Sequence, residues 1–272
     1  MKAYVVFGFT LVFSLVSALC AEDKNSANSE SLSVDQQLIL ACYQLDEVQV
    51  QKLLNSGADV NAKILSKNFK ELFRDHWTQG TPGAISQLTP LLAVAGSNRH
   101  PSPEFVSEKL GKKFEPVHGN RALIPNYMLK ERERRQVRIA TLLINKGADI
   151  HYQNGHGTTP LLEAIVDRNH DLAFHLIDFG ADVNVRLQAY IDGPGMITAL
   201  HEATGNPDLV EVLLLNGADP LAQNTDGKTP LEYALRRSSY ENEYESHHKY
   251  LKCVELLVEA IKKNDESLKL NE

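Results

Sequence analysis

The sequence predicts an all-α solenoid of about five helix-turn-helix units, because two signals recur along it in the same register. The first signal is the tripeptide Gly-Ala-Asp, and two successive copies begin 33 residues apart. The second is a helix-opening tripeptide, Thr-Pro-Leu or the similar Thr-Ala-Leu. The copies of the first signal begin at Gly57, Gly147, Gly180 and Gly217, and those of the second at Thr89, Thr159, Thr198 and Thr229.

The segment from Gly157 to Asn184 shows why one unit should form a helical hairpin. Thr159 can cap the first helix through its hydroxyl, and Pro160 takes the first helical position, where a missing N–H costs nothing. Two apolar stripes separated by a polar run then predict two helices joined by a turn. Gly180 falls where the second helix needs a left-handed residue, which glycine supplies without steric cost.

These residues resemble the ankyrin repeat, in which Thr-Pro-Leu-His opens the first helix and Gly-Ala-Asp leads into a hairpin turn. His201 takes the histidine position of that motif, where the resemblance implies a structural hydrogen bond near the helix opening. Other residues stand at this position in the other copies, namely Leu92, Leu162 and Glu232. The resemblance also implies an extended surface of hairpin tips and first helices that binds another protein.

The repeat register predicts the domain boundaries. A repeat domain is expected over 34–261, followed by a charged tail at 262–272. Its units, with short β-hairpin-like turns, are expected at about 34–63, 87–151, 155–185, 196–222 and 225–261. Two long insertions, at 64–88 and 99–136, and a shorter polar one at 238–249 should interrupt the units.

The two long insertions each leave two interpretations open. The first contains Phe73 and Trp77, which either anchor a partner or pack back onto the solenoid. From Arg99 to Arg135 the second has nine Lys or Arg residues against five Glu, so it is either a solvated charged face or a docking site for an acidic partner. A long helix is expected to follow Pro125 into the repeat.

Residues 1–20 have the features of a secretory signal peptide, because Lys2 precedes an uncharged apolar run that ends among small residues. A flexible lead, 21–33, should follow. The mature protein is therefore expected to be exported, to the bacterial periplasm or as a secreted protein, with no membrane contact after cleavage. Two alternatives remain open, an uncleaved membrane anchor with a structural role and a lipidated Cys20.

The composition and motifs argue against several kinds of function. The net charge is −7, which suits binding of nucleic acid poorly. No catalytic or phosphate-binding motif is present, so we expect no enzymatic activity and no cofactor. Cys42 and Cys253 belong to the first and last units and should not form a disulfide. A metal-dependent enzyme that uses His247, His248 and Glu245 is kept as an alternative.

The sequence therefore predicts a non-enzymatic module that binds another protein. An alternative within this class is an immunity or inhibitor protein that neutralises a toxin or enzyme. The predicted contacts lie on hairpin tips and in the insertions. They are Phe73, Trp77, Tyr152, His156, Arg186, Tyr190, Gln223 and Asp226.

Overall fold

The structure is a computed structural model that describes residues 32–65, 87–98, 126–155, 157–187, 197–240 and 244–270. The chain divides into two compact units, 1–33 and 34–272, and every described helix belongs to the second. The predicted signal peptide and nearly all of the predicted lead lie outside the described residues and stay predictions.

The described part of the second unit is mostly helical, and its helices follow one another in pairs. The first helices of the pairs are α2 (Val34–Gln44), α5 (Pro90–Ala95), α8 (Pro160–Val166), α10 (Ala199–Glu202) and α12 (Pro230–Tyr240). The second helices are α3 (Glu47–Asn55), α7 (Asn126–Asn145), α9 (His170–Asp178), α11 (Pro207–Leu215) and α13 (Tyr244–Leu270). A short 3-10 helix, η1 (Gly96–Asn98), follows α5.

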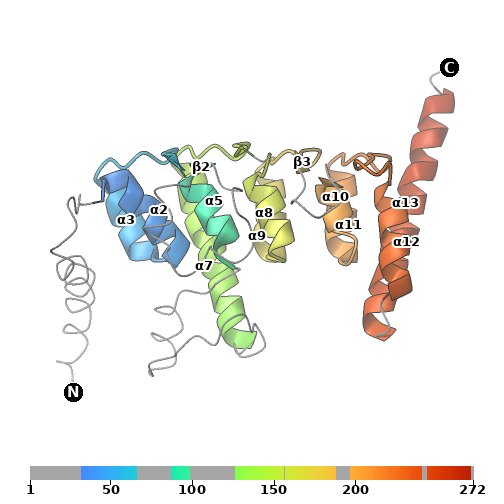
Figure 1. Cartoon of the computed structure of the whole chain (residues 1–272), viewed down its shortest axis with the longest axis horizontal. Helices are drawn as coiled ribbons and strands as arrows, with labels where there is room; N and C mark the ends of the chain where they lie inside the picture. Colours follow the sequence, from blue (N-terminus) through green and yellow to red (C-terminus); the bar gives the residue numbers. More distant parts are fainter. Residues whose placement is uncertain are drawn as a thin grey trace. The chain divides into compact units, whose positions relative to one another are not determined.

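The helices stack in two layers (Figure 1). Neighbouring first helices touch along α2, α5, α8, α10 and α12, and neighbouring second helices touch along α3, α7, α9, α11 and α13. One continuous cluster of buried apolar side chains lies between the layers, from Leu38 in α2 to Leu257 in α13. Each helix thus buries its apolar stripe against the other helix of its pair and against the neighbouring pair, as expected of a helical repeat.

The predicted caps explain where the helices begin. The hydroxyl of Thr89 accepts the N–H of Leu92 at 3.3 Å, and that of Thr159 accepts the N–H of Leu162 at 3.2 Å. Second helices begin after Asp46, Asn169 and Asn206, whose side chains accept the backbone N–H three residues on. These bonds satisfy donors that a helix start leaves without a partner.

Glycine ends the second helices of four pairs, as the sequence predicts. Gly57, Gly147, Gly180 and Gly217 have φ angles of 91°, 89°, 85° and 85°. The next residue donates its N–H to a carbonyl inside the helix, as Ala181 does to Leu176 at 3.0 Å. A residue with a Cβ would be strained at these positions.

Two small antiparallel hairpins accompany the stack. β1 (Ile64–Leu65) pairs with β2 (Gln87–Leu88), and β3 (Arg186–Leu187) pairs with β4 (Ile197–Thr198). The predicted insertion at 64–88 therefore begins and ends in paired strands.

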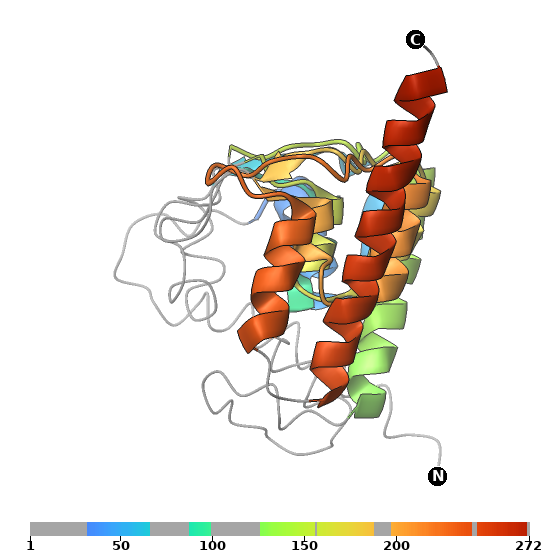
Figure 2. The same ribbon diagram turned by 90° about the vertical axis from the view of Figure 1, so that its right-hand side faces the viewer.

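The predicted polar insertion at 238–249 is helical at its beginning and at its end. α12 continues to Tyr240, α13 begins at Tyr244, and the two helices lie side by side (Figure 2). α13 also continues to Leu270, through most of the expected tail at 262–272. The physical reason is that no Gly or Pro interrupts the sequence after Pro230, so helix formation continues through the polar residues.

The end of the second long insertion is helical as well. α7 starts directly after Pro125 and crosses into the repeat, which is the long helix that the sequence predicts. Inside it, Gln136 is fully buried and donates to Val94 O at 2.9 Å and to Ser97 Oγ at 2.8 Å. Its Oε1 accepts from Asn169 at 2.7 Å. This buried network fixes α7 against α5 and α9.

Candidate functional site

The turns that follow the second helices form one edge of the stack, which we call the hairpin edge (residues 57–63, 147–153, 180–186 and 217–223). Asn184 connects two of these turns: its Oδ1 accepts the N–H of Asp219 at 2.9 Å, and its Nδ2 donates to the carbonyl of Gly217 at 2.9 Å. One side-chain amide thus satisfies a donor and an acceptor of the next turn. We call this arrangement the amide clamp.

The amide clamp occurs a second time, at Asn61, which binds the N–H of Asp149 at 2.8 Å and the carbonyl of Gly147 at 2.9 Å. At the start of the stack, Asp35 Oδ1 accepts the N–H of Asp59 at 2.8 Å. His151 stands where Asn61 and Asn184 stand in their own turns, and its side chain is exposed. The described junction from turn 147–153 to turn 180–186 therefore has a histidine in place of the clamping amide.

A row of carboxylates accompanies the clamps. Asp59, Asp149, Asp182 and Asp219 are exposed, and each accepts the backbone N–H two residues on at 2.8–2.9 Å. Side chains of this kind stabilise turns. They also give each turn of the hairpin edge one carboxylate, which Lys63 and Arg186 offset in two of the four turns.

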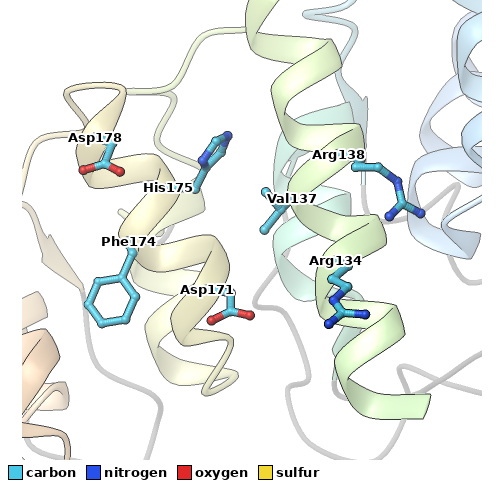
Figure 3. A pocket seen from close by; sticks show the side chains of 7 residues that line it. All are labelled: Arg134, Val137, Arg138, Asp171, Phe174, His175 and Asp178. Atoms are coloured by element: carbon cyan, nitrogen blue, oxygen red, sulfur yellow. The ribbon is translucent and has the colours of Figure 1, made fainter. Parts of the chain in front are cut away.

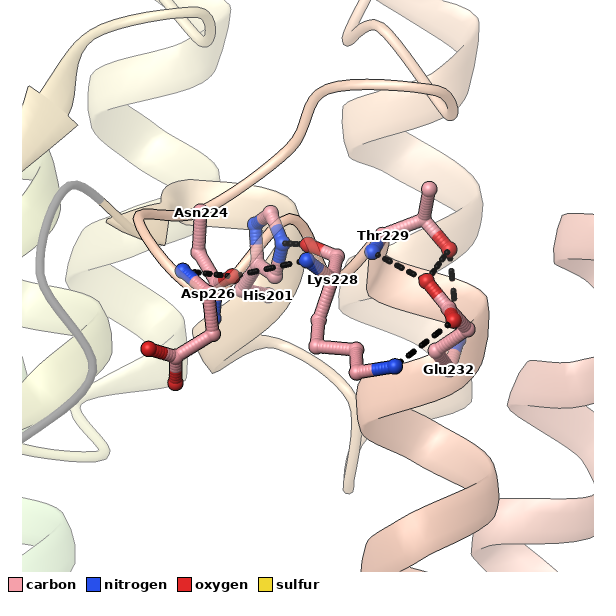
Figure 4. Close-up of polar contacts among 6 residues, drawn as sticks. All are labelled: His201, Asn224, Asp226, Lys228, Thr229 and Glu232. Carbon is pink, nitrogen blue, oxygen red and sulfur yellow. Dashed lines mark hydrogen bonds and ion pairs between the residues drawn. The ribbon is translucent and has the colours of Figure 1, made fainter.

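Near the helix openings, a polar network ties α10 to the loop before α12 (Figure 4). His201 is fully buried; its Nδ1 accepts the N–H of Thr198 at 3.2 Å, so its Nε2 carries the proton and donates to Lys228 O at 2.9 Å. Asn224 Oδ1 accepts the N–H of Asp226 at 3.0 Å and of Lys228 at 2.9 Å. The hydrogen bond implied for His201 by the ankyrin resemblance is present.

The predicted contact residues fall into three groups. Arg186, Gln223 and Asp226 are exposed on or beside the hairpin edge. Tyr152 is only 7% exposed: its hydroxyl donates to Gln87 at 2.9 Å, and Lys63 lies 4.8 Å from its ring centroid. Packing leaves this side chain little surface for a partner, and the contact at Tyr152 stays a prediction. The remaining four, Phe73, Trp77, His156 and Tyr190, lie outside the described residues.

The structure also contains a groove that sequence reasoning missed. It lies between the second helices α7 and α9, on the side of the stack away from the first helices, and has a volume of about 440 Å³ (Figure 3). We call it the outer groove. Its lining residues are Arg134, Val137, Arg138, Asp171, Phe174, His175 and Asp178.

The two walls of the outer groove carry opposite charges. α7 contributes Arg134 and Arg138, and α9 contributes Asp171 and Asp178. Arg138 is held toward α3, since it bonds Glu47 at 2.9 Å, and this bond raises the pKa of its guanidinium. Across the groove, Thr141 Oγ1 and His175 Nε2 lie 2.7 Å apart and connect the two helices.

The metal hypothesis finds no support in the described residues, which contain no group of three His, Cys, Asp or Glu side chains that could hold an ion. His247 Nδ1 lies 3.1 Å from the carbonyl of Ser238, and His248 is exposed. Nothing is described of the Glu245 side chain. Cys42 and Cys253 are buried and free, and burial raises the pKa of both thiols, that of Cys253 to about 11.

Among the described residues, no helix combines the length and the apolar character that a membrane span requires. Residues 1–20, on which the predicted signal peptide and the alternative anchor depend, lie outside that search.

The fold and the hairpin edge define a class of protein, a stack of helical pairs whose turns are joined along one edge. Residues 197–225, which contain β4, α10, α11 and the turn after α11, match the family model described as Ankyrin repeat. This match supports the resemblance that Thr198, His201 and Gly217 carry. An ankyrin repeat is a module for binding other proteins.

Three curated relatives are similar to parts of this chain, and one of them is named as an ankyrin repeat protein. The ankyrin repeat protein FPV031 of Fowlpox virus (strain NVSL) is 32% identical over 130 residues, which are 44% of this chain and 37% of the relative. XBAT35 of Arabidopsis thaliana, named as an E3 ubiquitin-protein ligase, is 40% identical over 91 residues, 32% of this chain and 19% of the relative. XBAT34 of the same plant, with the same kind of name, is 38% identical over 103 residues, 37% of this chain and 26% of the relative. The matched part of the chain thus spans about a fifth to two fifths of the length of these relatives.

Proposed function

We propose that this chain is a non-enzymatic ankyrin-repeat solenoid of about five units that binds another protein through its hairpin edge and first helices. The observation that carries the proposal is the hairpin edge itself. Asn61 and Asn184 hold successive turns in register, while Arg186, Gln223 and Asp226 remain exposed on or beside it. Because the backbone is fixed by internal bonds, these side chains can bind a partner without the turns having to become ordered.

A capture experiment tests this proposal. The triple variant Arg186→Ala, Gln223→Ala and Asp226→Ala should lose a partner that the native chain captures from its own compartment. The matched control carries the same kinds of truncation on exposed residues of second helices, Lys52→Ala, Asn145→Ala and Glu211→Ala, and should keep that partner. Equal capture by both variants, or no partner with the native chain, would contradict the proposal.

A role as an immunity or inhibitor protein is a second candidate. The charge favours it, because the net charge is −7 and the hairpin edge presents Asp59, Asp149, Asp182 and Asp219 in a row. Such a surface suits a basic toxin or enzyme, for which association would be fast at low salt. The test is survival of cells that carry a neighbouring toxin gene. Unchanged survival after deletion of this protein would remove the candidate.

Export is proposed on the sequence of residues 1–20, where Lys2 precedes an apolar run and small residues follow. Sequencing of the mature amino terminus tests it. A mature start at Ala21 or Leu19 in an exported fraction would support a cleaved signal peptide, and a retained Met1 would support the anchor instead.

The ligase names of XBAT35 and XBAT34 do not change this proposal. The matched segments cover 19% and 26% of those proteins. This similarity is too partial to assign their named activity to this chain.

A further inference from the structure

The outer groove lies on a different surface from the hairpin-edge candidates and has its own chemistry. Its α7 wall is basic, its α9 wall is acidic, and Val137 and Phe174 supply apolar surface. Figure 3 shows Arg134 and Asp171 on facing helices at the same end of the groove.

The charges of the groove are available to a ligand. Within the part of the chain that the structure describes, Arg134, Asp171 and Asp178 are exposed, and none of them forms an ion pair or a side-chain hydrogen bond. Arg138 differs, because Glu47 and Glu131 lie 2.9 Å and 3.6 Å from it. The free charges are therefore one cation on α7 and two carboxylates on α9.

The two walls belong to neighbouring second helices of one row. A third helix can lie along two such helices by placing its side chains between theirs, with axes about 8–10 Å apart. A helix in this position directs one flank at α7, the other at α9, and its central seam at Val137 and His175. Figure 3 shows Phe174 beyond Asp171, on the side of α9 away from α7.

We propose that the outer groove binds an amphipathic helix of a partner protein whose apolar seam has acidic residues along one flank and basic residues along the other. The acidic flank pairs with Arg134, and the basic flank pairs with Asp171 and Asp178. Charge complementarity on both walls selects the partner and fixes the direction in which its helix lies.

The position of the groove in the stack favours such binding. It lies at the junction between the pairs α5/α7 and α8/α9, where His151 stands in place of the clamping asparagine. At the other two described junctions an amide clamp joins the turns, since the side chains of Asn61 and Asn184 each form hydrogen bonds with the next turn. A small adjustment between α7 and α9 breaks no amide clamp, provided that it keeps the bonds of Gln136 to Asn169 and of Thr141 to His175, which join the two helices.

The experiment uses the full chain and two synthetic peptides of about 20 residues, long enough to form helix on their own. Both have the same Leu and Ala seam and the same numbers of Glu and Lys. In the segregated peptide Glu lies on one flank and Lys on the other, whereas in the interleaved peptide the two alternate on both flanks. Composition and net charge are thus equal, and fluorescence anisotropy at low salt measures both dissociation constants.

We expect the segregated peptide to bind about tenfold more tightly than the interleaved one, and added salt to reduce the difference. Two variants invert one wall each, Arg134→Glu on α7 and the pair Asp171→Lys and Asp178→Lys on α9. Each should bring the two peptides close to equal affinity. Combining all three substitutions exchanges the charges of the walls, and the preference should return because the peptide can bind in the reverse direction.

The control is Asp226→Lys beside the hairpin edge, which changes the charge by two, as Arg134→Glu does with the opposite sign, and should leave the preference unchanged. Circular dichroism confirms that each variant remains folded. Equal binding of both peptides by the native chain would overturn the proposal, and so would a preference that survives inversion of either wall. The capture experiment with Arg186, Gln223 and Asp226 uses other residues, so either proposal can fail while the other stands.

Discussion

The side chain of Asn184 accepts the backbone N–H of Asp219, 35 residues further along the chain, at 2.9 Å. Its amide nitrogen donates to the carbonyl of Gly217 in the same turn, also at 2.9 Å. A single side chain thus couples the ends of α9 and α11, although both residues are exposed. In a stack where each pair touches only its neighbours, such links determine how cooperatively the pairs unfold.

Replacing Asn184 by Ala should lower the free energy of unfolding by about 1–2 kcal/mol, since two hydrogen bonds between turns are lost at an exposed site. Urea denaturation measures the change. Asn184→Asp should cost at least as much, because a carboxylate keeps the acceptor for Asp219 but repels the carbonyl of Gly217. Gln153→Ala, at an exposed position of another turn, is the control, and a loss as large there would argue against a specific role for Asn184.

Replacing His151 by Asn should stabilise the protein by about 0.5–1 kcal/mol. The new amide would stand in the register of Asn61 and Asn184 and could bond the turn of Gly180 in the same way. His151→Ala separates this gain from the simple removal of an imidazole. If the urea concentration at the unfolding midpoint is no higher for His151→Asn than for His151→Ala, the turns at this junction are not placed for a clamp.

Local signals predicted much of this fold from the sequence, because caps and turns depend on few residues. Thr159 caps α8, Gly180 has a φ of 85° at the end of α9, and His201 bonds near a helix opening. The lengths of α12 and α13 were harder to predict. Polar residues there suggested a bulge, whereas a sequence without Gly or Pro continues as helix when its apolar residues pack. Here α12 and α13 pack on each other, and α13 also packs on α11.

The outer groove could not be predicted for a different reason. Arg134 lies in what the sequence shows as an insertion, and Asp171 lies 37 residues further on, in the polar run between the two predicted helices of the unit at 155–185. Each residue alone resembles an ordinary exposed side chain of an amphipathic helix. Only the packing of α7 against α9 shows that the two face one groove.

Replacing Arg168 by Gly should stabilise the protein by about 0.5–1 kcal/mol. Arg168 is exposed in the turn between α8 and α9 and has a φ of 57°, a conformation that costs a residue with a Cβ about 1–2 kcal/mol. The flexibility of glycine in the unfolded chain offsets part of this gain. Thermal or urea denaturation measures it.

The matched comparison is Leu45, which has a φ of 58° in the corresponding turn between α2 and α3 but is only 2% exposed. Leu45→Gly relieves the same strain and loses a buried side chain, so it should destabilise the protein by about 2 kcal/mol or more. Destabilisation by Arg168→Gly would mean that the arginine side chain stabilises the turn by more than its strained backbone costs.

Acid should destabilise the protein through His201. Burial lowers the pKa of its imidazole below the ordinary value of 6.5, with the nearby Arg186 charge acting in the same direction. Protonation would also remove the Nδ1 acceptor for the N–H of Thr198. Because the unfolded chain binds this proton more readily, the stability is fully present above about pH 6.5 and is lost as the pH falls from there through the folded pKa.

Unfolding free energies measured by urea denaturation between pH 7.5 and pH 5 test this prediction. His201→Gln should be less stable than the native chain at pH 7.5 by about 1–3 kcal/mol, because it leaves buried groups without their partners, and its stability should fall less toward pH 5. His170, whose pKa burial also lowers, accounts for part of the remaining slope. His248→Gln, at an exposed position, should keep the native pH dependence. An equal slope in the native chain and in His201→Gln would show that His201 does not control the response to acid.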